Sequence, residues 1–120
     1  MNVFCERVDN CTVVTVEGDL AVPDSDRFRD FLMQRVETGS CELLLDFSEV
    51  PYIDSSGIST LLVLLQAARR QGGDIRLVGV NDRIQELFKQ VGLKHVFRGF
   101  DTRDEGIASF TAVRSVDNTD

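Results

Sequence analysis

A short segment at residues 41–47 (CELLLDF) is mostly apolar, and it restricts the fold more than any other part of the chain. A strand with one face in water alternates apolar and polar residues, and this segment hardly alternates. We therefore expect it to form a central strand of a parallel or mixed sheet, covered on both faces. The rest of the chain must then supply the covering layers.

Other segments alternate between expected strands and expected helices. Residues 12–17 are rich in β-branched side chains, and with residues 3–7 they flank a turn at Asp9-Asn10, which predicts a hairpin. Further strands are expected at residues 74–80 and 95–97. Strands and helices at this spacing predict an α/β sandwich with right-handed crossover connections.

The best-marked helix is expected over residues 55–71, where it would stop at Gly72-Gly73. Its apolar stripe follows helical spacing and consists of Ile58, Leu61, Leu62, Leu65 and Ala68.

Three further helices are expected from capping residues and apolar spacing. The first would begin at the N-cap candidates Asp24 or Ser25 and end near Gly39. The next would be capped by Asn81 or Asp82 and end at Gly92, and the last would open with a capping box at residues 102–105 (TRDE).

Length and charge narrow the class of protein. The chain of 120 residues is long enough for one core but not for two, so we expect a single domain over residues 1–114 and a frayed polar tail at 115–120. Thirteen Lys and Arg against twenty Asp and Glu give a net charge of −7. This charge disfavours direct binding to nucleic acid or to an anionic membrane. With no signal segment and no apolar run long enough to span a bilayer, the expected location is the cytoplasm.

Cysteine and histidine provide no pattern for a metal, a cofactor or a catalytic site. Cys5, Cys11 and Cys41 lack C-x-x-C spacing, and His95 is the single histidine. Reduced thiols fit the cytoplasm. A serine hydrolase needs a base beside its nucleophile, and SSGIS does not match the G-x-S-x-G elbow. We therefore expect a chain that is not an enzyme and holds no metal or cofactor.

The candidate site follows the central strand, at residues 54–57 (DSSG). A tight connection delivers Asp54, Ser55 and Ser56 to the first turn of the best-marked helix, where several backbone N–H groups lack partners. One interpretation is capping, in which Asp54 or Ser55 accepts from those N–H groups while Gly57 allows close packing. The other is that a serine hydroxyl is a phosphate acceptor or part of an anion site, since the positive end of a helix accommodates a phosphoserine. The spacing alone does not separate Ser55 from Ser56.

A family resemblance is carried by the run LLLDFSEVPYIDSSGIS, the leucine-rich helix, the Gly-Gly turn and the strand-helix unit ending in VGL. In these features the chain resembles the STAS domain of bacterial anti-sigma factor antagonists. The resemblance covers nearly the whole chain. It implies a mixed sheet of about four or five strands flanked by helices. It also implies a regulatory cycle in which the unphosphorylated protein binds an anti-sigma factor serine kinase and so frees a sigma factor for transcription. Phosphorylation of one serine ends that binding, and a metal-dependent Ser/Thr phosphatase reverses it.

Carried over residue by residue, the resemblance implies that Ser55 is the phosphorylated serine and that Asp54 shapes its surroundings. The partner would bind the start of this helix and the loop after the second strand. The residues expected to contribute are Gly18, Asp19, Leu20, Asp24, Asp54, Ser56, Gly57, Ser59 and Thr60. The chain departs from the family at Ala21, where members often carry an acidic residue.

Two other functions remain open from the sequence. One is a STAS subunit of a transport or scaffolding assembly that is never phosphorylated. The other is direct binding of a nucleotide or another anion at the same helix start, which ligand titration would reveal as a raised melting temperature.

Overall fold

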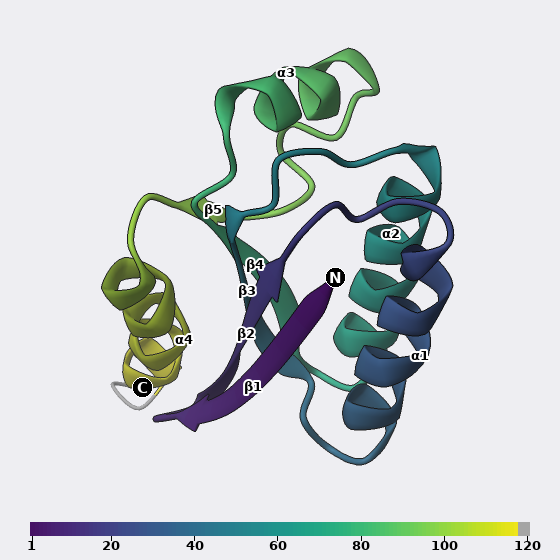
Figure 1. Cartoon of the computed structure of the whole chain (residues 1–120). Coiled ribbons are helices and arrows are strands. Elements are labelled where there is room, and N and C mark those ends of the chain that lie inside the picture. The colour runs from purple at the N-terminus through teal and green to yellow at the C-terminus, as the bar shows by residue number, and fades with distance from the viewer. Residues whose placement is uncertain (118–120) are drawn as a thin grey trace.

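The computed structural model describes the backbone of residues 1–117 and the side chains of residues 1–111. Over this part the chain alternates strands and helices (Figure 1). The strands are β1 (Asn2–Val8), β2 (Cys11–Glu17), β3 (Glu42–Glu49), β4 (Asp74–Val78) and β5 (Gly99–Phe100). The helices are α1 (Asp24–Glu37), α2 (Ser55–Arg70), α3 (Asp82–Gln90) and α4 (Arg103–Asp117). The expectation of a frayed tail at 115–120 falls largely outside the described residues and stays a prediction.

The strands form one sheet in the order β1-β2-β3-β4-β5. The β1–β2 hairpin is antiparallel, and every other pairing is parallel. The mixed sheet of five strands and the central position of β3 are therefore confirmed. In β3 the side chains of Leu43, Leu44, Leu45 and Phe47 are all fully buried. This burial on both faces explains why the segment does not alternate.

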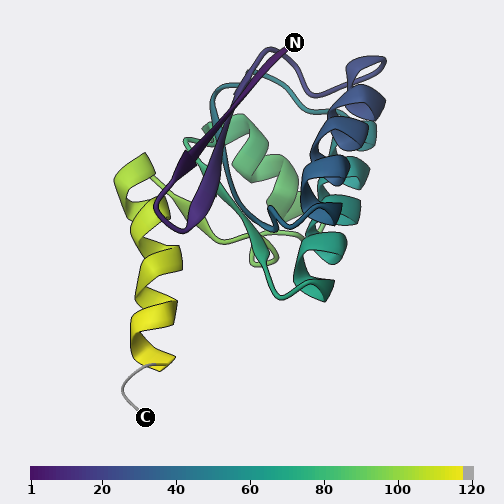
Figure 2. The same ribbon diagram turned by 90° about the horizontal axis from the view of Figure 1, so that it is seen from below.

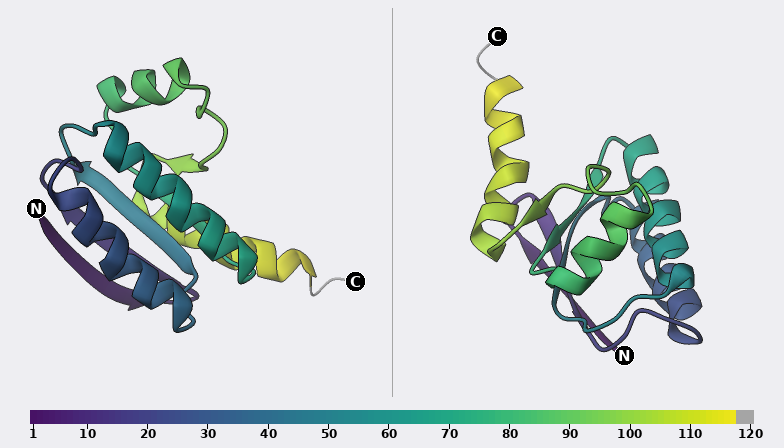
Figure 3. Two further views of the ribbon diagram at one scale, coloured as in Figure 1. Left: turned by 90° about the vertical axis from the view of Figure 1, so that its right-hand side faces the viewer. Right: turned by 90° about the horizontal axis from the view of Figure 1, so that it is seen from above.

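Helices cover both faces of the sheet. Helices α1 and α2 lie side by side on one face, α4 lies on the other, and α3 lies beyond the carboxyl ends of the parallel strands (Figures 2 and 3). Leu43 and Leu45 of β3 belong to the larger core under α1 and α2. Leu44 belongs to a smaller core with Phe110 of α4. The sheet thus divides the apolar interior into two unequal layers.

The buried face of α2 differs from the expected stripe. Leu61, Leu65 and Ala68 are buried as expected, but Leu62 and Ile58 are half-exposed, and Leu64 is fully buried instead. Leucine occupies four of the five positions from 61 to 65, so the pattern alone does not fix which side of the helix turns inward. Packing against α1 as well as against the sheet decides it.

The start of α1 is another difference. Asp24 and Ser25 lie inside the first turn, whereas Pro23 occupies the N-cap position and makes no side-chain cap. The N–H groups of Asp24 and Ser25 donate to the carbonyl oxygen of Ala21, at 2.8 and 3.0 Å. A backbone turn therefore satisfies N–H groups that a side-chain cap would otherwise bind.

The prediction of a strand at residues 95–97 is wrong. Phe97 is buried, with its ring stacked on that of Phe88 at a centroid distance of 5.9 Å. Sheet pairing begins only afterwards, where the N–H of Leu77 donates to the carbonyl of Arg98 at 2.9 Å. Core packing of one aromatic side chain thus displaces the strand to Gly99–Phe100.

Capping predictions elsewhere are confirmed. The side chain of Asn81 accepts from the N–H of Ile84 at 2.8 Å and caps α3. Thr102 and Glu105 form the reciprocal capping box of α4, each side chain accepting from the other's N–H at 3.2 Å.

Candidate functional site

Two loops meet at the carboxyl ends of β2 and β3, and together they build the candidate site. The N–H of Leu20 donates to the carbonyl of Tyr52 at 3.0 Å, and the N–H of Asp54 donates to the carbonyl of Leu20 at 3.3 Å. These bonds extend the parallel pairing as a short bridge between Leu20 and Ile53. The loop after β2 is therefore fixed beside the start of α2.

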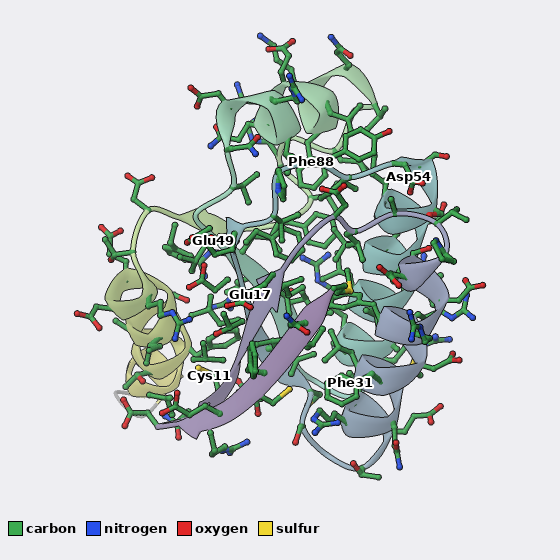
Figure 4. The ribbon with its side chains drawn as sticks, viewed as in Figure 1. Cys11, Glu17, Phe31, Glu49, Asp54 and Phe88 are labelled. Atoms are coloured by element: carbon green, nitrogen blue, oxygen red, sulfur yellow. The ribbon has the colours of Figure 1, made fainter. Side chains whose placement is uncertain are left out.

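Asp54 lies at the start of α2 (Figure 4), and its carboxylate connects these segments. Its Oδ1 accepts from the N–H of Gly57 at 3.0 Å and from the hydroxyl of Ser56 at 2.5 Å. Its Oδ2 accepts from the N–H of Val22 at 3.1 Å. The Ser56 hydroxyl bond, together with the backbone donors, outweighs desolvation and holds the pKa of Asp54 below its ordinary value. Asp54 is thus an ionised N-cap of α2, as the capping interpretation predicts.

The two adjacent serines differ in a way that the sequence does not show. Ser56 is half-buried, and its hydroxyl contacts Asp54 and, at 2.8 Å, the hydroxyl of Ser25. Ser55 is exposed, and within the described residues its side chain makes no hydrogen bond. Ser55 is therefore the hydroxyl that a second protein can reach.

The other predicted site residues lie at different depths. Leu20, Gly57 and Thr60 are buried, so they shape the site from beneath its surface. A Cβ added at Gly57 would clash with the carbonyl oxygen of Leu20 and lie 2.8 Å from a methyl carbon of Ile53. Such close packing explains the glycine after the two serines.

The accessible surface includes the remaining predicted residues. Asp19 and Ser59 are exposed, and Ser59 lies one turn after Ser55 on α2. Asp24 is partly exposed and pairs with Arg27 at 2.6 Å. Gly18 is half-buried, and its N–H donates to the carbonyl of Glu49 at 2.9 Å.

Sequence reasoning missed two exposed apolar side chains beside Ser55. Val22 is 71% exposed and Tyr52 is 47% exposed. Both flank Asp54, Val22 through its backbone bond and Tyr52 two positions earlier in the chain. Apolar residues in loops next to prolines, Pro23 and Pro51, were the available signal.

Asn81 holds the second loop from the opposite side. While its oxygen caps α3, its side-chain N–H₂ group donates to the carbonyls of Val50 and Pro51, at 3.3 Å each. The loop before Ser55 is therefore braced from both β2 and α3.

This arrangement suits a phosphoryl acceptor better than a catalytic nucleophile. Ser55 has no histidine or carboxylate within hydrogen-bond distance among the described residues, and Asp54 already accepts from three other donors.

In the described part of the chain, no group of three or more His, Cys, Asp or Glu side chains is placed to hold a metal ion. The helices described there are too short or too polar to cross a membrane. Cys5, Cys11 and Cys41 are free thiols.

The mixed sheet with this helix start defines a class of domain. The family model "STAS domain" matches residues 3–106, so the chain belongs to the STAS domain family, and the sequence resemblance is confirmed. The chain is 27% identical over 96 residues to the anti-sigma-B factor antagonist of Bacillus subtilis (strain 168), an alignment that covers 80% of this chain and 87% of the relative.

Solved structures show the same fold. The anti-sigma factor antagonist SpoIIAA in its unphosphorylated form matches with a TM-score of 0.80 and 18% identity, over 92% of this chain and 97% of that one. The phosphorylated form of the Bacillus cell fate determinant SpoIIAA matches with a TM-score of 0.72 and 19% identity, over 91% and 99%.

Proposed function

We propose that this chain is an anti-sigma factor antagonist whose binding is switched by phosphorylation of Ser55. The observation that carries the proposal is the exposed hydroxyl of Ser55 at the start of α2, which has no hydrogen-bond partner among the described residues, in a STAS domain whose relatives include anti-sigma-B factor antagonists. Unphosphorylated, the chain binds an anti-sigma factor and so frees a sigma factor. The anti-sigma factor is a serine kinase, and this chain is its substrate rather than an enzyme.

Phosphoryl transfer places the reactive chemistry on the partner. The Ser55 oxygen attacks the γ-phosphorus of ATP held by the kinase, ADP leaves, and the hydroxyl proton passes to a base on the kinase. A metal-dependent Ser/Thr phosphatase reverses the step by directing water to the phosphorus. We propose that the chain itself acts in the cytoplasm, where its thiols stay reduced.

The fold tolerates the phosphate, while the interface does not. The positive end of α2 accommodates the roughly −1.5 to −2 charge of phosphoserine. The same charge follows Asp54 directly in the chain, at the helix start where the exposed Val22 and Tyr52 flank Asp54. A partner that covers these side chains would have to desolvate the phosphate, so it dissociates.

The test is intact-mass analysis with fragment mapping of the chain purified from its native host, under growth and stress conditions. We expect one phosphoryl group on Ser55 that changes in occupancy with conditions and is absent from Ser55→Ala. Ser40→Ala, which alters a half-exposed serine outside the predicted partner-binding residues, should keep it. The absence of phosphate under every condition would refute the switch and favour an unphosphorylated subunit of a transport or scaffolding assembly.

A further inference from the structure

A buried serine on α1 contacts the site from below. Ser25 is only 2% exposed, and its hydroxyl oxygen lies 2.8 Å from that of Ser56, which is 31 positions later in the chain. Helices α1 and α2 run side by side, so their first turns adjoin (Figure 3). Neither helix capping nor the exposed surface around Ser55 accounts for this contact.

The direction of the hydrogen bonds follows from the number of protons available. Each serine hydroxyl carries one proton, and an ionised carboxylate can only accept. Ser56 donates its proton to Oδ1 of Asp54. Ser25 must therefore donate to Ser56, which makes a directed chain from Ser25 through Ser56 to Asp54.

Together with a second bond to Asp54, these hydrogen bonds attach the segment that leads into α1 to the start of α2. The other carboxylate oxygen of Asp54 accepts from the N–H of Val22, three residues before Ser25. The segment at residues 22–25 is therefore held at both ends by the start of α2. Donation from Ser25 polarises the Ser56 hydroxyl and strengthens its bond to Asp54. Losing the Ser25 hydroxyl therefore releases one end of the segment and loosens the geometry of the Val22 bond at its other end.

We propose that Ser25 is a positioning residue for the Ser55 site: acting through Ser56 and Asp54, its hydroxyl holds the loop that carries Val22 against the start of α2. Its importance for phosphorylation rests on the proposed function, whereas the hydrogen-bonded chain itself does not.

Amide hydrogen exchange measured by NMR tests the proposal in the isolated protein. The variants are Ser25→Ala, Ser56→Ala and the double variant, and exchange at Val22 is normalised to exchange at the buried Leu44 in β3. Ser25→Ala should speed exchange at Val22 by about two- to tenfold, the range that corresponds to losing one hydrogen bond. In the Ser56→Ala background, Ser25→Ala should produce no further acceleration, because the Ser56 hydroxyl that links Ser25 to Asp54 is already missing.

Two controls separate this role from simple packing. Ser109→Ala also removes a buried helical hydroxyl, which donates to the carbonyl of Gly106 at 2.6 Å, and it should leave exchange at Val22 unchanged. Ser25→Cys nearly preserves the volume but donates weakly, so it should accelerate exchange as the alanine variant does even if Ser25→Ala fails to fold.

Equal acceleration by the Ser25 changes in the presence and absence of the Ser56 hydroxyl would overturn the proposal, since Ser25 would then act by packing alone. No acceleration at Val22 would overturn it as well. No kinase is used in this experiment, so a failure of the proposed function, seen as missing phosphate on Ser55, would not be confused with either result.

Discussion

Arg103 at the start of α4 lies with its Nε 2.6 Å from Oδ2 of Asp46 in β3. The same guanidinium donates to the hydroxyl of Thr15 in β2 at 2.6 Å. Oδ1 of Asp46 also accepts from the N–H and the hydroxyl of Ser48, and the Asp46 side chain is only 10% exposed. Helix α4 is thus held on the sheet by an ion pair as well as by its small apolar core.

This ion pair predicts a loss of stability in acid. Burial raises the pKa of Asp46, but hydrogen bonds from Ser48 and Arg103 outweigh it and hold that pKa below the ordinary 3.8. A carboxyl group with a lowered pKa stabilises the folded state above about pH 4. This contribution to stability is lost as the pH falls through the lowered pKa. Asp54 acts in the same direction. Urea denaturation should therefore give an unfolding free energy that begins to fall below about pH 5, near the ordinary carboxyl pKa of about 4, and keeps falling as the pH drops further.

Replacing Arg103 measures how much the ion pair contributes to the unfolding free energy. Arg103→Ala leaves Asp46 with a buried charge and one fewer partner, and should lower the unfolding free energy by about 1–2 kcal/mol at pH 7, since the arginine is itself partly exposed. The fall with acid should become shallower. Arg83→Ala, which removes an exposed arginine on α3, should change stability by less than about 0.5 kcal/mol. Equal effects of both changes would contradict a role for the ion pair.

Ser55 and Ser56 should differ in stability as they differ in contacts. Ser55→Ala removes no hydrogen bond within the described residues and should change the unfolding free energy by less than about 0.5 kcal/mol. Ser56→Ala removes the contacts to Asp54 and Ser25 and should cost about 1–2 kcal/mol. Denaturant midpoints of the two variants at pH 7 decide the matter, and the reverse order would refute this geometry.

Gly57→Ala should be one of the most disruptive single-methyl changes. The added carbon would clash with the carbonyl of Leu20, and backbone cannot yield as a flexible side chain can. We expect a loss of about 1–3 kcal/mol. At Gly99 a Cβ would meet nothing nearer than an atom at 3.9 Å, so Gly99→Ala is the matched control and should have a much smaller effect. Thermal melts of the two variants suffice for this comparison.

The buried face of α2 makes a further stability prediction. Leu64→Ala removes a fully buried side chain and should cost about 2–5 kcal/mol. Leu62→Ala, at a half-exposed position, should cost roughly half as much or less because fewer contacts are lost. Val63→Ala, 42% exposed, provides the surface reference. A larger loss for Leu62 than for Leu64 in urea denaturation would show that the helix faces the core differently.

Val22 and Tyr52 should contribute to partner binding without contributing to stability. Tyr52 is of a residue type that often dominates interface energetics, and the exposed Val22 adds apolar area to the proposed interface. The double change Val22→Ser with Tyr52→Ser should weaken binding to the anti-sigma factor at least about tenfold. Phe4→Ser, 56% exposed on β1, should leave the affinity unchanged. Calorimetric titration gives both affinities, and an unaltered affinity in the double variant would place the interface elsewhere.

Much of the fold follows from short-range patterns. The apolar run of β3, the Asn81 cap and the capping box at Thr102 each depend on residues within a few positions of one another. Their physical causes are local: burial on both faces of a strand, and unsatisfied N–H groups at a helix start. The same locality explains why the DSSG motif predicts a helix start with an N-cap.

Long-range contacts decided what the patterns left open. Phe97 turns inward onto Phe88 and so moves the edge strand to Gly99–Phe100, which no local propensity indicates. In the same way, packing against α1 selects Leu64 over Leu62.

The difference between Ser55 and Ser56 shows most clearly what the local sequence determines and what tertiary packing decides. The sequence by itself determined that two hydroxyls follow Asp54 at the start of a helix. Only the tertiary structure brings Ser25, 31 positions earlier, against Ser56 and leaves Ser55 facing solvent. A hydrogen bond between two helices depends on how those helices pack, and that packing depends on the whole core rather than on the residues next to the motif.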